Sequence, residues 1–335
     1  MHRIEQSARL LTVGGVETYL AFIQGVELRH FCAFDVFRDE AAVAELEASF
    51  LAPTADAALA SGHDLLIDAL VWRAHGDYVR ALGHGPRGVE AVNRHAVERV
   101  RRFAERWRST TPGSERIGMF INGDIGPRGD GYRVEAVGPG DALDYHRRQV
   151  RVLAELGVDV VSALTMTHAD EAIGIALAAA EAGLPVIISP TVETDGRTPE
   201  GQALGELIER VDDATGGGPL FYMVNCAHPT HLEPVLREAA DRGEAWLPRM
   251  SGLRANASTK SHAELDDSEV LDRGAPRELA GQLARLRREF GWRLVGGCCG
   301  TDAEHIRCIA HAVAEDAPQD GHARGADTPW RASAR

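Results

Sequence analysis

The chain has 335 residues, and its 36 basic and 50 acidic side chains give a formal net charge of −14. Hydrophobic residues make up 44% and charged residues 26%, as in an ordinary globular protein that is long enough to bury a large core. This acidic balance argues against a nucleic-acid or anionic-membrane partner, because both partners require a basic face.

The apolar segments and the cysteine count indicate in which cellular compartment the protein is expected. The longest apolar candidate for a membrane span, Ala172–Ala180, ends at Glu181 and is far shorter than the ~18 residues that a span needs. Glu5 lies close to the few basic residues of the N-terminus, so no secretory signal is expected. Five cysteines, an odd number, fit a reducing compartment. We therefore expect a cytoplasmic protein that binds no membrane, and its sequence is compatible with a homo-oligomer.

Short apolar runs alternate with longer segments of helical periodicity along the chain. Strands are predicted at 10–13, 65–70, 117–121, 158–163, 185–189, 220–224, weakly near 245–247, and at 293–295. Helices are predicted at 40–60 (with a break or kink at Pro53), 90–108, 141–156, 169–182, 201–211, 231–242, 277–290 and 301–314.

Eight strand–helix units in succession predict a single (β/α)₈ barrel of the TIM type over residues 1–315. A doubly wound open sheet is the alternative, but no Gly-x-Gly-x-x-Gly follows a predicted strand. Residues 316–335 are rich in Pro, Gly, Asp and Arg and lack apolar periodicity, so a disordered tail is expected there.

The last predicted strand ends in Gly-Gly-Cys-Cys-Gly-Thr at residues 296–301. Adjacent residues of a regular strand point to opposite faces, so Cys298 and Cys299 converge only if the backbone turns irregularly, which the glycines permit. Thr301 and Glu304 match a capping box, with Thr301 as the N-cap. The two thiols would then precede a helix N-terminus, whose partial positive charge favours thiolates.

A third cysteine, Cys226, ends the sixth predicted strand. The carboxyl ends of all strands of a barrel open on one rim, where active sites form. Three thiolates on that rim would make a zinc site with an open fourth position, as in catalytic zinc centres. The alternatives are cysteines that only pack in the core, ligation by His228 or His231, and a strained Cys298–Cys299 disulfide. Cys32 and Cys308 are not expected to be ligands.

At these residues the sequence resembles the homocysteine S-methyltransferase family. The resemblance rests on residues 296–301 followed by Glu304-His305-Ile306, on Asn225-Cys226 with Pro229, and more weakly on most of residues 10–315. It implies a zinc-dependent barrel that methylates the thiol of homocysteine to give methionine. Its zinc ligands carry over onto Cys226, Cys298 and Cys299. Substrate-binding residues are implied at Gly14, Gly15, Glu17, Thr18, Asn225 and Asn256.

Two positions depart from the family pattern. The family usually carries an aspartate before the glycine pair and an acidic residue after the fourth strand, where this chain has Val13 and the run Leu164-Thr165-Met166-Thr167-His168. In the family those carboxylates help to hold the amino group of the acceptor. Glu17, two residues beyond the glycines, is a candidate replacement, although it could also simply begin a helix.

The expected partners are therefore a small-molecule thiol acceptor and a methyl donor. Zinc in an open site deprotonates a bound thiol, and the resulting zinc-bound thiolate would attack the activated methyl group. The sequence leaves the donor open among S-adenosylmethionine, S-methylmethionine, betaine and methylfolate. Alternative functions are methylation of another small thiol and a non-catalytic zinc-binding barrel.

Overall fold

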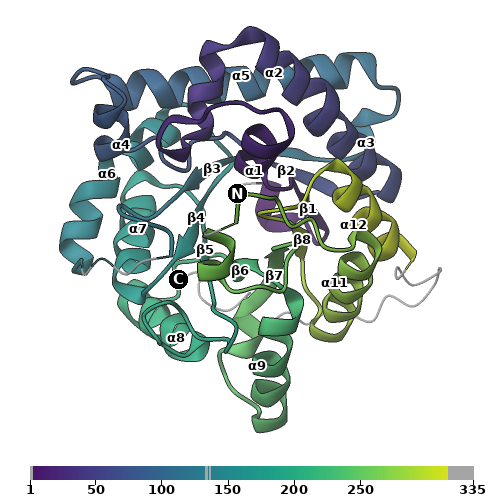
Figure 1. The fold of residues 1–335 in the computed structure, drawn as a ribbon. Coiled ribbons are helices and arrows are strands. Elements are labelled where there is room, and N and C mark those ends of the chain that lie inside the picture. The colour runs from purple at the N-terminus through teal and green to yellow at the C-terminus, as the bar shows by residue number, and fades with distance from the viewer. Residues whose placement is uncertain (1–2, 133–134, 136, 267, 316–335) are drawn as a thin grey trace.

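The computed structural model describes residues 3–132, 135, 137–266 and 268–315. Eight parallel strands close into a barrel in the order β1 to β8, and β1 pairs with β8 through Leu10 opposite Leu294. Figure 1 shows the strands at the centre, with the helices arranged around them. The predicted TIM barrel is confirmed, and closure excludes the open doubly wound sheet. The tail expected at 316–335 lies outside the described residues.

The strands are short and buried along most of their length. They are β1 Leu10–Thr12, β2 Asp64–Asp68, β3 Met119–Ile125, β4 Val160–Met166, β5 Val186–Pro190, β6 Tyr222–Ala227, β7 Met250–Ala255 and β8 Leu294–Gly297. Seven of the predicted strands overlap these. The weak prediction near 245–247 is wrong, because Leu247–Arg249 form the 3₁₀ turn η7 and the strand begins at Met250.

The α-helices of the outer layer include all eight predicted ones, the first of them divided at 47–51, and two short ones at 76–81 and 262–266 that were not predicted. They are α2 Glu40–Leu46, α3 Ala52–Ser61, α4 Gly76–Ala81, α5 Gly88–Thr110, α6 Pro139–Glu155, α7 Ala169–Ala182, α8 Leu204–Thr215, α9 Pro229–Arg242, α10 His262–Asp266, α11 Pro276–Phe290 and α12 Ala303–Glu315. Pro53 stands in the first turn of α3, where a missing backbone N–H costs little. Every helix among the described residues is too short or too polar to cross a bilayer.

Before α2 come the short helix α1 Val16–Thr18, the π-helical turn η2 Tyr19–Ile23 and two 3₁₀ turns, η3 Arg29–Phe31 and η4 Ala33–Arg38. The π-helical turn η5 Glu47–Leu51 joins α2 to α3, and η6 Ser114–Arg116 precedes β3.

Two apolar layers hold the barrel together. The inner layer includes Leu10, Leu66, Phe120, Ile187 and Leu294, which fill the barrel interior. Ile4 of the 3₁₀ turn η1, Arg3–Gln6, belongs to the same layer, and the Arg293 guanidinium donates to the carbonyls of Ile4, Glu5 and Ser7. The amino-terminal end of the barrel is thus plugged, and the cavity described next opens at the other end.

Candidate metal centre and substrate cavity

Three thiols converge at the carboxyl end of the barrel. The sulfur atoms of Cys226, on β6, and of Cys298 and Cys299, directly after β8, all lie within 4.8 Å of one another. Cys226 is buried, whereas the other two are partly exposed, and all five cysteines of the chain are free thiols. No other group of three or more metal-ligating side chains occurs among the described residues, and neither His228 nor His231 joins this one.

The backbone bends sharply where the strands meet the cavity. Leu70, Thr165 and Cys226 follow or end the even-numbered strands β2, β4 and β6, and their φ angles are 63°, 62° and 57°. Residues other than glycine adopt this left-handed region at a cost of about 1–3 kcal/mol each. The parallel ladders are irregular at Leu164/Met166 and at Asn225/Ala227. The backbone therefore leaves the regular strand conformation at these residues, beside the thiol cluster.

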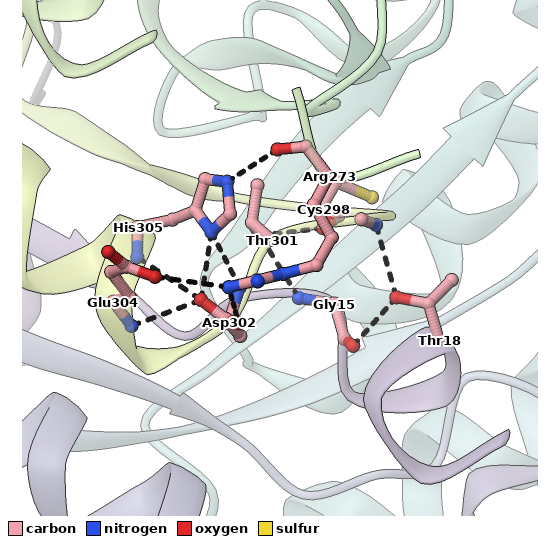
Figure 2. A network of polar contacts seen from close by, with 9 residues as sticks. Gly15, Thr18, Arg273, Cys298, Thr301, Asp302, Glu304 and His305 are labelled. Atoms are coloured by element: carbon pink, nitrogen blue, oxygen red, sulfur yellow. Dashed lines mark hydrogen bonds and ion pairs between the residues drawn. The ribbon is translucent and has the colours of Figure 1, made fainter. Parts of the chain in front are cut away.

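The turn that carries Cys298 is fastened to the loop after β1, as Figure 2 shows. The Thr301 hydroxyl donates to the Cys298 carbonyl at 2.7 Å and accepts from the Gly15 amide at 3.3 Å. Thr18 donates its hydroxyl to the Gly15 carbonyl at 3.0 Å and accepts from the Gly300 amide at 3.1 Å. Gly300 has φ +77°, and a Cβ on Gly15 would overlap the Cys298 carbonyl. These contacts explain the glycines and threonines of both motifs.

The predicted capping box is wrong by one residue. Helix α12 begins at Ala303, and Asp302 rather than Thr301 accepts the amides of Glu304 and His305, at 3.1 and 3.3 Å. His305 places its Nδ1 2.8 Å from the Asp302 carboxylate and its Nε2 2.8 Å from the Arg273 carbonyl (Figure 2). Thr301 is left free to hold the cysteine turn.

The sulfur atoms receive hydrogen bonds from three side chains. Tyr132, in the loop after β3, donates its hydroxyl to Cys226 Sγ at 3.0 Å. Asn256 Nδ2 lies 3.6 Å from Cys226 Sγ, and Asn225 Nδ2 lies 3.9 Å from Cys298 Sγ. Such donors stabilise negative charge on sulfur. Hydrogen bonds from the neighbouring thiols hold the pKa of Cys226 well below its usual range, despite burial.

The imidazole of His262, on α10, contacts the backbone carbonyl of Cys226. Its Nε2 lies 2.7 Å from the Cys226 carbonyl and its Nδ1 2.9 Å from Glu193 Oε1, so each ring nitrogen faces an acceptor. Burial alone would lower the pKa of His262, but interactions with Cys226 and Glu193 raise it to about 10. The imidazolium form satisfies both acceptors. Its ring also packs on that of Tyr132, with centroids 4.3 Å apart.

The thiols open into a cavity of about 400 Å³. Thr165 and the thiols line it together with all six residues predicted to bind substrate: Gly14, Gly15, Glu17, Thr18, Asn225 and Asn256. The Asn225 side-chain oxygen accepts from the Thr165 amide and from the Ser189 hydroxyl, both at 2.7 Å. The hydroxyl of Thr18 and the side chain of Asn225 are thus engaged within the protein. Glu17 forms no ion pair among the described residues.

Charged residues that the sequence analysis did not single out line the inner part of the cavity. Arg254 of β7 forms a buried, two-pronged ion pair with Asp68 of β2, at 2.6 and 3.2 Å. Asp124 of β3 lies nearby, and both its oxygens accept from the Val71 amide, at 3.1 and 3.2 Å. A charged residue near the carboxyl end of an otherwise apolar strand is a signal that could have identified Asp68 and Asp124. Tyr132 lies in a glycine-rich loop with no such signal.

Cys32, Cys308 and His228 lie outside the thiol cluster, where they contribute to packing and helix capping. Cys32 is fully buried, and its thiol contacts the His30 carbonyl at 3.6 Å. Burial raises the pKa of Cys32 to about 12, so it stays a neutral thiol. Cys308 packs on the apolar core from α12. His228 precedes α9 and accepts from the Thr230 amide, as a capping residue does.

Comparison with known proteins shows which family this chain belongs to. The homocysteine S-methyltransferase family model matches residues 10–313. Methionine synthase of Mycobacterium leprae is 34% identical over 134 residues, which cover 39% of this chain and 10% of that protein. Homocysteine S-methyltransferase 1 of Arabidopsis thaliana is 26% identical over 182 residues, half of each protein. The chain therefore spans half or less of the length of these curated relatives.

Among solved structures, the metallated form of the homocysteine methyltransferase MmuM from Escherichia coli has a similar fold, with a TM-score of 0.69 and 18% sequence identity. The match covers 90% of this chain and 95% of that one. Its oxidized form gives the same TM-score at 19% identity. These likenesses agree with the closed barrel of Figure 1.

Proposed function

Because the chain is an enzyme of the homocysteine S-methyltransferase family, we propose that it transfers a methyl group from an activated donor to the thiol of homocysteine, forming methionine. The observation that carries this proposal is the convergence of three thiols on the wall of a cavity at the carboxyl end of the barrel. TIM-barrel enzymes have their active sites at this end.

The thiol cluster fits a zinc ion. Tetrahedral zinc with Zn–S bonds of ~2.3 Å places its sulfur ligands ~3.8 Å apart, and the three sulfur atoms already lie within 4.8 Å of one another. Tyr132 and Asn256 lie outside the three sulfurs and donate to Cys226. Outer hydrogen bonds of this kind orient metal ligands. Cys226, Cys298 and Cys299 would hold the ion and leave the fourth position facing the cavity.

Zinc bound there would act as a Lewis acid that lowers the pKa of an acceptor thiol. The protein's own contribution is alignment. The Thr301 and Thr18 hydrogen bonds fix the Cys298 turn, and the cavity beside the thiols would hold both reactants. In the transfer, a lone pair of the acceptor sulfur forms the new S–C bond while the methyl–donor bond breaks. That bonding pair leaves with the donor, and the thiol proton passes to solvent. Alignment of two reactants is worth ~7–11 kcal/mol.

A donor-by-acceptor panel tests the proposal. Zinc-loaded protein would be incubated with homocysteine or a simple alkyl thiol, and with each of the four donors named above, and the products identified by mass spectrometry. We expect methionine from at least one donor. Product from the alkyl thiol alone would instead assign another acceptor, and stoichiometric zinc without any product would assign a non-catalytic zinc-binding barrel.

The ligand assignment needs a matched pair of variants. We expect Cys226→Ala to lose most of its zinc and its activity while the barrel stays folded, because one of three sulfur ligands is gone. Cys308→Ala, a change of the same type outside the cluster, should retain both. Metal analysis and circular dichroism of the two proteins measure this, and full zinc occupancy in Cys226→Ala would contradict the assignment.

A further inference from the structure

The contact between Tyr132 and Cys226 depends on a loop rather than on a helix or strand. Tyr132 donates its hydroxyl to Cys226 Sγ at 3.0 Å, yet residues 126–132, which follow β3, form neither helix nor strand. Loops vary in position more than the elements that they connect. A phenol that stays within hydrogen-bond distance of a thiol therefore requires this segment to be fixed by other contacts.

A buried pair of side chains outside the cavity holds the loop. Glu171, in the first turn of α7, places its Oε1 2.9 Å from Nε2 of His146 on α6, and both side chains are almost completely buried. The same oxygen accepts the backbone amide of Arg128 at 2.7 Å. One carboxylate thus joins two helices of the outer layer to the loop that carries Tyr132.

The other outer contacts of the loop are more exposed to water. Arg128 Nε donates to Asp77 at 3.0 Å, but these side chains are 47% and 39% exposed, and ion pairs of this kind contribute little. Tyr78, which is partly exposed, donates its hydroxyl to the Gly129 carbonyl at 3.2 Å. Because a hydrogen bond shielded from water is stronger, the bond to Glu171 should fix the loop more firmly than these contacts.

Close packing transmits the position of Arg128 to Tyr132. The Tyr132 amide donates to the Asp130 carboxylate at 2.8 Å, which closes a tight turn. A Cβ on Gly131 would lie 3.1 Å from the methyl group of Thr165, so the backbone passes directly over that side chain. The segment therefore has little freedom to absorb a shift at Arg128.

Stability alone does not explain the Glu171–His146 pair. Replacing a buried pair of polar, ionisable side chains by apolar residues of similar volume is often neutral or stabilising. An apolar pair could fill the same space between α6 and α7, but it would offer no acceptor to the Arg128 amide. The feature specific to this pair is its hydrogen bond to the loop.

We propose that Glu171 is a positioning residue for the metal centre: it binds the Arg128 amide and thereby keeps the Tyr132 hydroxyl at Cys226. This inference rests on the proposed function, because Cys226 matters here as a ligand of the zinc ion. Removing a hydrogen-bond partner of a metal ligand typically lowers metal affinity roughly 10–100-fold. A residue that acts through Tyr132 should therefore alter zinc binding without contacting any of the three thiols.

A double-mutant cycle tests this route, with zinc affinity measured by chelator competition. We expect Tyr132→Phe to weaken zinc binding by about tenfold or more, and Glu171→Ala by about fivefold or more. The double variant should bind zinc within about twofold of Tyr132→Phe alone, because no hydroxyl is left for Glu171 to position. Glu171→Gln keeps an oxygen for the Arg128 amide and should retain nearly the affinity of the unmodified protein.

Hydrogen–deuterium exchange of the metal-free protein gives a readout that depends on neither zinc nor activity. The segment 126–132 should exchange faster in Glu171→Ala but not in Tyr132→Phe, because only the first change deprives the Arg128 amide of its acceptor.

Glu181→Ala is the matched control. Glu181 also joins α7 to α6, through Arg147 at 2.8 Å, but it makes no hydrogen bond to residues 126–132. Its removal should leave zinc affinity and exchange unchanged. Circular dichroism shows whether each variant is folded, and if Glu171→Ala does not fold, Glu171→Asp, with a side chain one methylene shorter, replaces it under the same expectations.

Unaltered zinc affinity in the folded Glu171 variant would overturn the inference while the metal centre stands. Losses that multiply in the double variant would overturn it as well, because Glu171 and Tyr132 would then act independently. Faster exchange without weaker zinc binding would assign Glu171 to the loop alone. Failure of the unmodified protein to bind zinc would refute the metal centre, and the inference with it.

Discussion

Removal of one partner from the buried Asp68–Arg254 pair should strongly destabilise the barrel, and Arg254→Met tests this. Both side chains are buried and joined at 2.6 and 3.2 Å, across a sequence separation of 186 residues. At an effective dielectric constant of ~20, opposite charges ~4 Å apart attract by ~4 kcal/mol. Removing one partner leaves the other charge buried, which costs ~3–5 kcal/mol. Asn122 still donates to Asp68 but cannot neutralise it. We therefore expect Arg254→Met to lower the free energy of unfolding by about 3–5 kcal/mol.

Urea denaturation followed by circular dichroism measures this loss, with zinc content held equal in all samples because bound metal adds to apparent stability. The second variant combines Arg254→Met with Asp68→Asn, which removes the stranded charge. It should recover more than half of the loss. A loss below about 1 kcal/mol in Arg254→Met, or a double variant no more stable than the single one, would refute this account of the pair.

Three further predictions concern the cysteine turn and the helices around it. Burial alone would raise the pKa of Asp302, but the His305 hydrogen bond lowers it from 3.8 to about 2. The ionised carboxylate therefore stabilises the folded state by ~2 kcal/mol above pH ~4, and this stabilisation is lost as the pH falls towards 2. Asp302→Asn should therefore unfold at lower urea concentration than the parent at pH 7 and at nearly the same concentration at pH 2. Gly15→Ala should weaken zinc binding at least tenfold in a chelator competition, because its Cβ overlaps the Cys298 carbonyl; Gly281→Ala, in open space on α11, should instead raise stability by up to ~1 kcal/mol. Cys308→Ser should retain full zinc by metal analysis, and loss of metal there would show that the wrong three cysteines were chosen.

The barrel was predictable because the period of the apolar pattern changes between strands and helices along the chain. The one misplaced strand shows the limit of that pattern. Trp246 and Leu247 are apolar but belong to a turn, whereas β7 contains Arg254, a charge that the pattern excludes from a buried strand. Arg254 is tolerated there because Asp68 pairs with it from β2, and a contact between residues so far apart leaves no local trace in the sequence.

The thiol cluster was equally accessible from the sequence, since strand ends of a barrel share one rim. The residues that surround the cluster were harder to predict from the sequence. Tyr132 reaches Cys226 only through the course of the loop after β3, and His262 belongs to α10, a five-residue helix with no periodic signal. Thr301 looked like a helix cap because Glu304 stands three residues later. Its hydroxyl is instead used for tertiary contacts, and Asp302 takes the capping role.

The left-handed backbone conformations of Leu70, Thr165 and Cys226 limit which substitutions could make this enzyme more stable to heat. Relaxing such a conformation with glycine normally gains stability, but glycine at 226 removes a sulfur, and glycine at 165 removes the hydroxyl that accepts from Asn225. At Thr165 and Cys226 the conformational strain therefore cannot be removed in this way without losing a group that the proposed site uses. Stabilising substitutions belong at the opposite end, around Ile4 and Arg293, which pack the barrel and do not line the cavity.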